Sequence, residues 1–397
     1  MRLLVKFPSR NRNQQFLATL RLYVLKCNHP LLTDFLITLD TDDASMIHSH
    51  DEIASILVGH RHQIVYGTSK NKIDAINRDM ELATDWDILL LASDDMIPEV
   101  QGYDDVIRET MRAHYPDLDG VLWFNDGYVG DKLNTLVCMG SAYYTRDGYI
   151  YNPAYKSFFC DNEFMDRANE RKLQTYIPQC IVRHQHPANT GATADDLYTH
   201  NDRYWNEDEK TYLHGKSYPY DLSVLICSLK ERLPMLKRLV KELEFFKTFS
   251  SLTIEIITDT DNREKTIGQK RNDLVGKAKG KYCCFIDDDD QVSKYYFKEI
   301  EEALTDKPDC VSMLGMLYQN NHRVKPFVHS IETDKYMEDE EAFYRPPNHL
   351  NPILTGLVKR VGFPTKNWGE DTDFAMRIRA LLHTEGKVRN LLYHYYK

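Results

Sequence analysis

The sequence predicts an α/β protein made of two tandem domains, each with a mainly parallel central sheet flanked by helices. At 397 residues the chain is too long for one ordinary core and suits two, because compact domains usually run about 100–200 residues. Short apolar segments alternate with helical ones, and the same order of signals occurs twice. We therefore expect one domain at residues 1–186, a connecting segment at 187–220 and a second domain at 221–397.

Each half opens with an apolar strand, a polar turn and a helix. These are predicted at 3–7, 8–12 and about 15–25 in the first half, and at 223–227, 228–232 and 233–246 in the second. A second strand follows, at 35–39 and 254–258, and each ends at an aspartate, Asp40 or Asp259. Ligands in parallel sheets lie beyond the carboxyl ends of the strands, which is where both aspartates are expected.

The next repeated signal is a wholly apolar strand that is followed directly by a cluster of acidic residues. Residues 88–92 precede Ser93-Asp94-Asp95, and residues 282–286 precede Asp287-Asp288-Asp289-Asp290. A helix that contains Asn77 in the first half and Asn272 in the second comes before this strand. The separation from the asparagine to the third residue of the acidic cluster differs by only one residue between the halves. We expect both clusters at the ligand-binding edge of their sheets.

Acids before a helix, followed by a histidine, complete the repeat. The first half has Asp161-Asn162-Glu163-Phe164, and the second has Glu370-Asp371-Thr372-Asp373-Phe374. His184 follows Asp161 at the same distance as His394 follows Asp371. Equal spacing indicates an internal duplication. The stretch from Pro187 to about Tyr220 lacks clear periodicity, which suits a connecting segment.

Composition narrows the partners and the compartment. The formal net charge of −10 works against a broad electrostatic grip on nucleic acid, which is disfavoured as a partner although a local basic patch leaves it open. Eight cysteines without a Cys-x-x-Cys pair favour a reducing compartment. No apolar run approaches the roughly 20 residues of a membrane span, and the N-terminal apolar stretch is shorter than a signal-peptide core. We therefore expect a cytoplasmic protein with no membrane span.

The motifs resemble those of the family 2 glycosyltransferases of the GT-A fold, a Rossmann-like fold of nucleotide-diphospho-sugar transferases. The second half is similar over most of residues 221–397, through Asn272, Ala278, Gly280, the four aspartates and the segment from Trp368 to Phe374. The first half is similar through the segment from Pro8 to Arg12, Asp40, Asn77 and Ser93-Asp94-Asp95. It departs where the family has Glu-Asp, and its Asp-x-Asp is reduced to Ser-Asp-Asp.

The resemblance implies that each half binds a nucleotide-diphosphate sugar through a divalent cation. Carboxylates suit Mn²⁺ or Mg²⁺, which stabilises the charge that develops on the departing diphosphate. Asp95 and Asp289 are the implied metal ligands, and His184 and His394 are implied to complete the two sites, with His186 as the rival of His184. The remaining residues assigned to the nucleotide sugar are Arg10, Asp40, Asn77 and Asp94 in the first half and Ser228, Asp259, Asn272, Asp287 and Asp288 in the second.

We assign Asp371 as the general base, because a carboxylate at the start of a helix near the sugar can remove the acceptor proton during in-line attack. Glu370 belongs to the same motif, and Asp161 has the equivalent role in the first half. His349 and Asn351 lie where related enzymes have acceptor loops. The expected function is metal-dependent, inverting transfer of a sugar, with UDP as the favoured nucleotide, to a hydroxyl of a glycan, a protein or another acceptor. Two active sites would make the chain bifunctional.

Each assignment has a structural alternative. The acidic clusters also fit a solvated loop or a helix cap, and acids in a first helical turn are favoured by the helix dipole. Strand-end aspartates fit ordinary turns, and lone histidines are often structural. Two functional alternatives stay open: transfer to hydroxylated bases of DNA, and a single active transferase in residues 221–397 beside a noncatalytic binding domain in residues 1–186.

Overall fold

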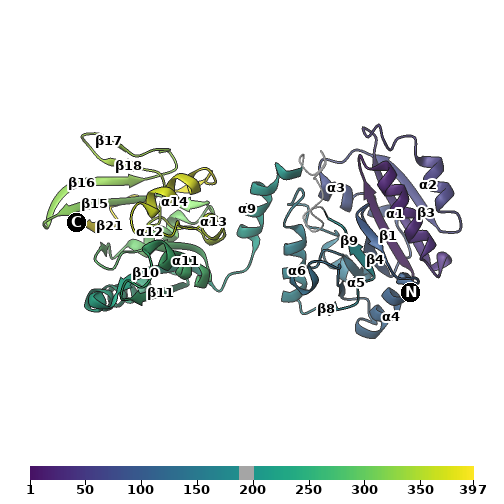
Figure 1. The fold of residues 1–397 in the computed structure, drawn as a ribbon, viewed down its shortest axis with the longest axis horizontal. Helices are drawn as coiled ribbons and strands as arrows, with labels where there is room; N and C mark the ends of the chain where they lie inside the picture. The colour runs from purple at the N-terminus through teal and green to yellow at the C-terminus, as the bar shows by residue number, and fades with distance from the viewer. Residues whose placement is uncertain (187–200) are drawn as a thin grey trace. The chain divides into compact units, whose positions relative to one another are not determined.

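The computed structural model describes residues 1–186 and 201–397, which divide into two compact units, Met1–Tyr212 and Leu213–Lys397 (Figure 1). We call them unit 1 and unit 2. Of the expected connecting segment, residues 187–200 lie outside the described part, whereas helix α9 (Trp205–Gly215) begins in unit 1 and ends in unit 2. Within the described ranges, no helix combines the length and the apolar character that crossing a membrane requires.

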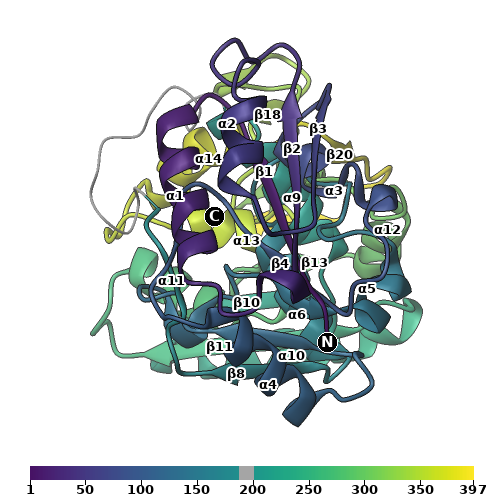
Figure 2. The ribbon, with the colours of Figure 1, turned by 90° about the vertical axis from the view of Figure 1, so that its right-hand side faces the viewer.

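Unit 1 contains a seven-stranded sheet in which β1, β2 and β3 run parallel beside one another (Figure 2). Strand β4 continues the parallel set, β7 is antiparallel to both β4 and β6, and β8 is parallel to β6. The sheet is therefore mixed, because β7 enters against its neighbours. The strands are β1 (Leu3–Ser9), β2 (Thr33–Asp40), β3 (His62–Gly67), β4 (Ile88–Leu91), β6 (Val121–Phe124), β7 (Cys138–Gly140) and β8 (Gln174–Ile177), in the order β3-β2-β1-β4-β7-β6-β8.

Helices cover both faces of this sheet, because successive side chains of a strand point to opposite faces. Leu3, Val5 and Phe7 of β1 pack in a core with residues of α1, α2 and α4. Leu4 packs on the opposite face in a second core with residues of α3, α5 and α6. The helices are α1 (Asn13–Leu25), α2 (His50–Ile56), α3 (Lys72–Asn77), α4 (Tyr103–His114), α5 (Ser141–Asp147) and α6 (Cys160–Glu170).

Unit 2 contains a six-stranded sheet and a second sheet beside it. The central strands are β10 (Tyr220–Leu229), β11 (Ile254–Asp261), β12 (Gly280–Phe285), β14 (Cys310–Val311), β19 (Ile353–Leu354) and β20 (Glu385–Gly386), in the order β11-β10-β12-β19-β14-β20. The second sheet has the order β13-β21-β15-β16-β18-β17, with β13 (Gln291–Val292), β15 (Met313–Gln319), β16 (His322–His329), β17 (Met337–Glu338), β18 (Phe343–Arg345) and β21 (Tyr393–Tyr396). The helices are α10 (Leu233–Phe246), α11 (Ile267–Lys277), α12 (Tyr296–Ala303), α13 (Thr355–Val361) and α14 (Glu370–Arg379).

The two central sheets share one topology. Strands β2-β1-β4-β7-β6-β8 of unit 1 and β11-β10-β12-β19-β14-β20 of unit 2 have the same order. The successive pairs are parallel, parallel, antiparallel, antiparallel and parallel in both. A short antiparallel ladder accompanies each sheet, formed by β5 (Met96–Pro98) with β9 (Val182–His184) and by β13 with β21. The repeated order of signals in the sequence is thus also a repeated strand order.

Strand register identifies equivalent residues in the two units. Leu3 pairs with Thr33 and Ile88, and Leu222 pairs with Ile254 and Tyr282. Counting along the strands from these pairs matches Ser9 with Ser228, Ser93 with Asp287, Asp94 with Asp288, and Asp95 with Asp289.

The same register corrects one expected equivalence. It matches Asp40 with Asp261 and not with Asp259, because β11 continues for two residues beyond Asp259. The sequence suggested an earlier end, since the polar residues Thr258, Asp259 and Thr260 look like a turn.

Candidate active sites

The acidic cluster of unit 1 is held at the carboxyl edge of the sheet. Asp94 follows β4 and is buried. Its carboxylate accepts hydrogen bonds from Ser9 Oγ at 3.4 Å and from Arg12 Nη1 at 3.0 Å. Burial raises the pKa of Asp94 to about 6, although Arg12 opposes the shift.

Unit 2 holds its acidic cluster in the same way. Asp288 follows β12 and is buried. It accepts hydrogen bonds from Ser228 Oγ at 2.6 Å and from Arg232 Nη1 at 2.9 Å. In each unit a serine at the end of the first strand and an arginine of the following turn therefore fix the equivalent carboxylate.

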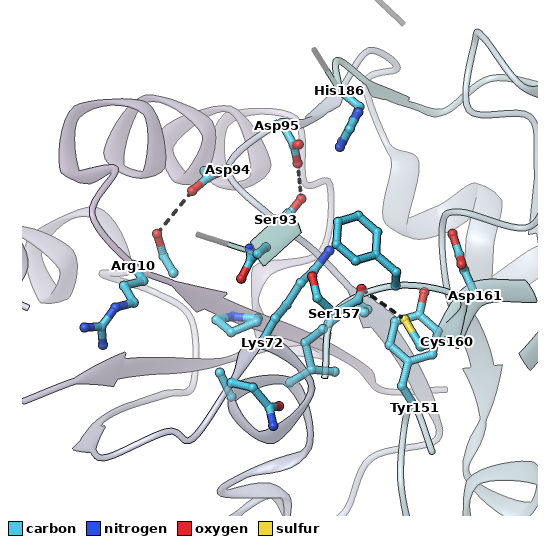
Figure 3. Close-up of a pocket in the computed structure, with 18 of the residues that line it drawn as sticks. Arg10, Lys72, Ser93, Asp94, Asp95, Tyr151, Ser157, Cys160, Asp161 and His186 are labelled. Carbon is cyan, nitrogen blue, oxygen red and sulfur yellow. Dashed lines mark hydrogen bonds between the residues drawn. The ribbon is translucent and has the colours of Figure 1, made fainter. Parts of the chain in front are cut away.

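A cavity of about 840 Å³ opens beside the acidic cluster of unit 1 (Figure 3). Ligand sites typically have volumes of about 300–1,000 Å³, so this cavity has room for a large ligand or for two small ones. Arg10 lies at one end and Asp161 at the other, with Asp94 and Asp95 between them (Figure 3). The predicted site residues that line it are Arg10, Asp40, Asp94, Asp95, Asp161, His184 and His186.

Arg10 and Asp40 form the charged end of this cavity. Arg10 Nη1 lies 2.8 Å from Asp40 Oδ2 and 2.7 Å from Asp42 Oδ1. Asp40 also accepts hydrogen bonds from Ser69 Oγ at 2.6 Å and from Arg78 Nη1 at 3.2 Å. These contacts, with a further hydrogen bond from Arg10 Nη2 to Asp42 Oδ2 at 2.9 Å, hold the planar guanidinium of Arg10 at the end of β2, where its remaining N–H groups can meet a phosphate or a base.

Asp95 and His184 are the residues of unit 1 that fit a divalent cation. The β5–β9 ladder sets His184 opposite Met96, and His184 Nε2 lies 3.6 Å from Asp95 Oδ2. The Nδ1 atom of His184 is buried and has no hydrogen-bond partner within the described residues. Burial raises the pKa of Asp95, but His184 and then Ser93 outweigh it and hold this pKa well below the usual range. The ring of His186 stands 5.7 Å from that of His184, and burial lowers the pKa of His186.

One carboxylate and one imidazole leave most coordination positions for phosphate oxygens and water, as Mn²⁺ and Mg²⁺ prefer. No set of three or more His, Cys, Asp or Glu side chains in residues 1–186 and 201–397 is arranged to hold a metal ion. A cation at Asp95 and His184 would therefore need a ligand that brings its own oxygens, and a diphosphate does so.

Asp161 occupies the first turn of α6 at the far end of the cavity. Burial raises its pKa, and the positive charge of Lys72 opposes this shift. Lys72 begins α3 and points into the cavity (Figure 3). Sequence reasoning missed Lys72, because a lysine at a helix start is ordinary on a surface.

Asn77 and Asn272 are bound to backbone. Asn77 Nδ2 donates to Tyr151 O at 2.7 Å, and Asn77 Oδ1 accepts from Tyr151 N at 3.1 Å. Asn272 makes the same pair of contacts with Phe363, each at 2.8 Å. Both amides fix a neighbouring loop, and Asn77 is absent from the described residues that line the cavity. The structure therefore does not bring Asn77 to the other predicted site residues.

A cluster of charged side chains, centred on the buried Arg271, includes Asp287 of the acidic cluster of unit 2. Arg271 Nη2 is 3.5 Å from Asp287 Oδ1, and Arg271 Nε is 3.4 Å from Glu370 Oε1. His349 Nε2 lies 3.6 Å from Asp287 Oδ2. Burial raises the pKa of Asp287, but His349 and Arg271 outweigh it and hold this pKa well below the usual range. Asp371 follows Glu370 in the first turn of α14 and is half-buried.

Asp289 faces Arg232, whose Nη1 lies 2.9 Å away. Burial raises the pKa of Asp289, with Arg232 opposing. Lys265 Nζ lies 3.2 Å from Asp259 Oδ2. The buried Asn351 donates a hydrogen bond from its Nδ2 to the backbone oxygen of Val311 at 2.8 Å.

The structure does not bring His394 to Asp289. His394 Nδ1 lies 3.4 Å from Tyr318 Oη, on the side of the second sheet. Unit 2 has one more residue, Asp290, between its acidic cluster and β13 than unit 1 has before β5. Asp290 is tied to β21 by Tyr393 Oη and by Tyr396 N, each at 2.8 Å. Equal spacing in the sequence thus led to unequal surroundings, because the insertion shifts the ladder.

Three neighbouring positions differ together between the units. Asn77 and Asn272 stand at the same distance from the first residue of their helices, so Ile76 is the counterpart of Arg271. Helices α6 and α14 both begin after a residue in the left-handed region, Phe159 (φ 57°) or Gly369 (φ 68°). Their first residues, Cys160 and Glu370, are therefore equivalent. Unit 2 has Arg271, Asp287 and Glu370 where unit 1 has the neutral set Ile76, Ser93 and Cys160.

Comparisons with known proteins give one family match, and it lies in unit 2. Residues 223–368 match the family model described as glycosyl transferase family 2. No curated protein gives a match. Among solved structures, residues 1–349 of TarS from S. aureus in complex with UDP show 16% identity and a TM-score of 0.34, with 45% of this chain and 60% of that chain covered. The mannosyltransferase PcManGT from Pyrobaculum calidifontis, in complex with GDP-Man and Mn²⁺, shows 10% identity and a TM-score of 0.41, with 54% and 62% covered. The chain thus spans less than two thirds of either structure.

Unit 2 has the GT-A fold. Residues 223–368 are a family 2 glycosyltransferase domain. The family model ends just before Glu370 and Asp371, and it does not extend into unit 1.

Proposed function

We propose that both units are inverting, metal-dependent glycosyltransferases, so that the chain is a tandem enzyme with two GT-A-like sites. One observation carries this proposal: Asp94 and Asp288 stand at the same register, and each accepts hydrogen bonds from a serine and an arginine of equivalent segments. The shared strand order supports it further. The donor is a nucleotide-diphosphate sugar, with UDP as the nucleotide, and the acceptor is a hydroxyl.

In unit 1, Asp95 and His184 would hold Mn²⁺ or Mg²⁺. When bound, the ion supplies Lewis acidity that stabilises the departing diphosphate. Asp40 would accept a hydrogen bond from the base and Arg10 would meet the phosphates or the base. At the opposite end, Asp161 would take the proton of the acceptor hydroxyl, and a raised pKa suits a base that works near neutral pH. Attack from the Asp161 side, away from the diphosphate, would invert the anomeric carbon.

In unit 2, Asp289 would provide the metal carboxylate and Asp371 the base. Asp287 and Asp288 would face the ribose, with Ser228 fixing Asp288. Arg271 and Glu370 would position Asp287, because the buried Arg271 contacts Asp287 and the buried Glu370 contacts Arg271. Asp261, the counterpart of Asp40, would act beside Asp259 at the base end. A cation here would have fewer protein ligands than in unit 1, since His394 faces Tyr318.

A second candidate keeps unit 2 as the only catalyst and makes unit 1 a binding module. The neutral residues Cys160 and Ser93, at the places of Glu370 and Asp287, favour this alternative. It predicts a unit 1 that holds a ligand in its cavity without cleaving it.

Metal-dependent hydrolysis and transfer from a panel of nucleotide sugars test the proposal. Asp161→Asn in a chain that already carries Asp371→Asn should abolish the remaining turnover, because a positioned acid or base contributes typically 10²–10⁴-fold. Asp85→Asn and Asp306→Asn are matched controls that alter exposed carboxylates of units 1 and 2. Turnover that depends on Asp371 alone would favour the binding-module alternative, and turnover that survives both changes would contradict both assignments.

A further inference from the structure

Four aromatic residues, Phe158, Phe159, Tyr204 and Trp205, line the same cavity of unit 1, and we call them the aromatic wall. The ring of Trp205 lies 4.9 Å from that of Phe158 and 5.0 Å from that of Phe159. The ring of Tyr212 stacks on that of Phe159 at 5.7 Å. Trp205 keeps 44% of its surface exposed despite these contacts. The wall therefore offers an open aromatic face inside a cavity.

The loop that carries Phe158 and Phe159 is held in a defined shape. Asp208 of α9 is fully buried, and its carboxylate accepts hydrogen bonds from the backbone N–H groups of Lys156, Ser157 and Phe158 at 2.8–2.9 Å. Phe159 has a φ of 57°, a left-handed conformation that is strained for a bulky residue. Such strain persists only where the surroundings enforce it, and it clusters at functional sites. Helix α9 is thus part of the site.

The aromatic wall adjoins the proposed base. Phe159 precedes α6, and Asp161 lies in the first turn of that helix. Arg10, at the charged end, lies across the acidic cluster from Asp161 (Figure 3). A donor that extends from Arg10 to the acidic cluster would leave the space between Asp161 and the wall for a second substrate.

We propose that the aromatic wall is the acceptor subsite of unit 1 and that the acceptor is a saccharide; this inference rests on the proposed function. A pyranose presents C–H groups on its faces and hydroxyls on its rim, so that one face can lie on Trp205 while a hydroxyl reaches Asp161. Aromatic rings supply large rigid apolar area, and the side chains of Asp161 and Asn162, which also line the cavity, can accept hydrogen bonds from hydroxyls. Stacked nucleobases are the competing occupants, but the formal net charge of −10 disfavours a phosphate backbone.

Unit 2 carries a related feature at the equivalent position. Trp368 stands directly before the left-handed Gly369, as Phe158 stands before Phe159, and its side chain is 90% exposed. An aromatic residue therefore precedes the proposed base in both units.

Acceptor kinetics on the full chain test this assignment. In a chain that carries Asp371→Asn, transfer to chitobiose, cellobiose and maltose would report on unit 1. Trp205→Leu should raise the KM for the saccharide about tenfold or more, because it removes the aromatic face. The donor KM and the rate of donor hydrolysis by water should stay within twofold. Tyr128→Leu is the matched control, since Tyr128 is also 44% exposed in unit 1 but is not among the described residues that line the cavity.

The outcomes separate this inference from the proposed function. Donor hydrolysis without stimulation or binding by any of the three saccharides, measured by saturation-transfer NMR, would overturn the acceptor subsite and leave the proposed function standing. An unchanged saccharide KM in Trp205→Leu would overturn it as well, and so would transfer to a single-stranded oligodeoxynucleotide in place of the saccharides. A unit 1 that neither binds nor cleaves any donor would instead contradict the proposed function.

Discussion

The charged cluster of the buried Arg271 and Glu370 with the partly exposed Asp287 gives the sharpest stability test of the residue equivalences between the two units. Arg271→Ile leaves the buried carboxylate of Glu370 and the partly exposed carboxylate of Asp287 without this cation. Breaking a buried pair by removing one partner typically costs about 3–5 kcal/mol, because an uncompensated charge stays buried. For a unit of this size about 1 kcal/mol shifts the melting temperature by roughly 2–4 °C, so we expect a fall of roughly 6–20 °C.

Replacing the whole cluster should be much milder. The triple change Arg271→Ile, Asp287→Ser and Glu370→Cys installs the residues of unit 1, and it removes the charges together. Substituting a complete buried charge group by neutral residues is often close to neutral, and we expect a cost of about 1–2 kcal/mol from lost packing volume. The triple variant should therefore melt at a higher temperature than Arg271→Ile alone.

Differential scanning calorimetry of the full chain measures this directly. The transition of unit 1 serves as the internal reference, and Ile76→Arg is the matched control that buries a lone charge in unit 1. A two-unit chain is analysed transition by transition, because it does not unfold in one step. A triple variant that loses the sum of the three single effects, or an Arg271→Ile variant that melts like the wild type, would refute the reasoning.

Two further predictions concern pH. Burial raises the pKa of Asp161, and the positive charge of Lys72 opposes this shift. Because a general base must be deprotonated to work, the activity of unit 1 should fall with decreasing pH, and this fall should begin at a higher pH than the ordinary aspartate pKa of about 3.9 would give. Lys72→Met should move that limb to still higher pH in pH–rate profiles, and a shift to lower pH would contradict the assignment. Burial lowers the pKa of His329 to about 3, with Arg345 and His349 adding to the shift. Because the unfolded state takes up a proton near pH 6.5 and the folded state does not, unit 2 should lose up to about 1.4 kcal/mol per pH unit as pH falls from about 6 to 4. His329→Gln should reduce this slope in urea unfolding, and an equal slope in both proteins would contradict it.

The sheet edge of each unit follows from local signals in the sequence. Apolar strands end in acid at Asp94 and at Asp287, and the polar turns after the first strands carry Ser9 and Ser228. Because parallel strands align their carboxyl ends, the sequence alone is enough to predict that these residues lie close together. The contacts Ser9–Asp94 and Ser228–Asp288 are the result.

Strand ends and residue pairs that depend on strand register or on contacts between distant residues could not be predicted from the sequence. The extension of β11 to Asp261 depends on its ladder with β10 and not on the polar residues themselves. Arg271 and Glu370 are 99 residues apart, and neither carries a local signal of the other. One inserted residue, Asp290, turned an equal spacing of His184 and His394 into different surroundings. Residues 205–215 lacked clear periodicity, yet they form a helix, and its buried Asp208 fixes the neighbouring loop.

Calorimetric titration with UDP in the presence of Mn²⁺ tests the central claim that each unit holds a metal-bound nucleotide beside its acidic cluster. The account predicts two UDP molecules bound per chain, one in Asp95→Asn, one in Asp289→Asn and none in the double variant, with binding lost when Mn²⁺ is chelated. A single UDP per chain that is insensitive to Asp95→Asn would contradict it, and so would binding that does not require the metal ion.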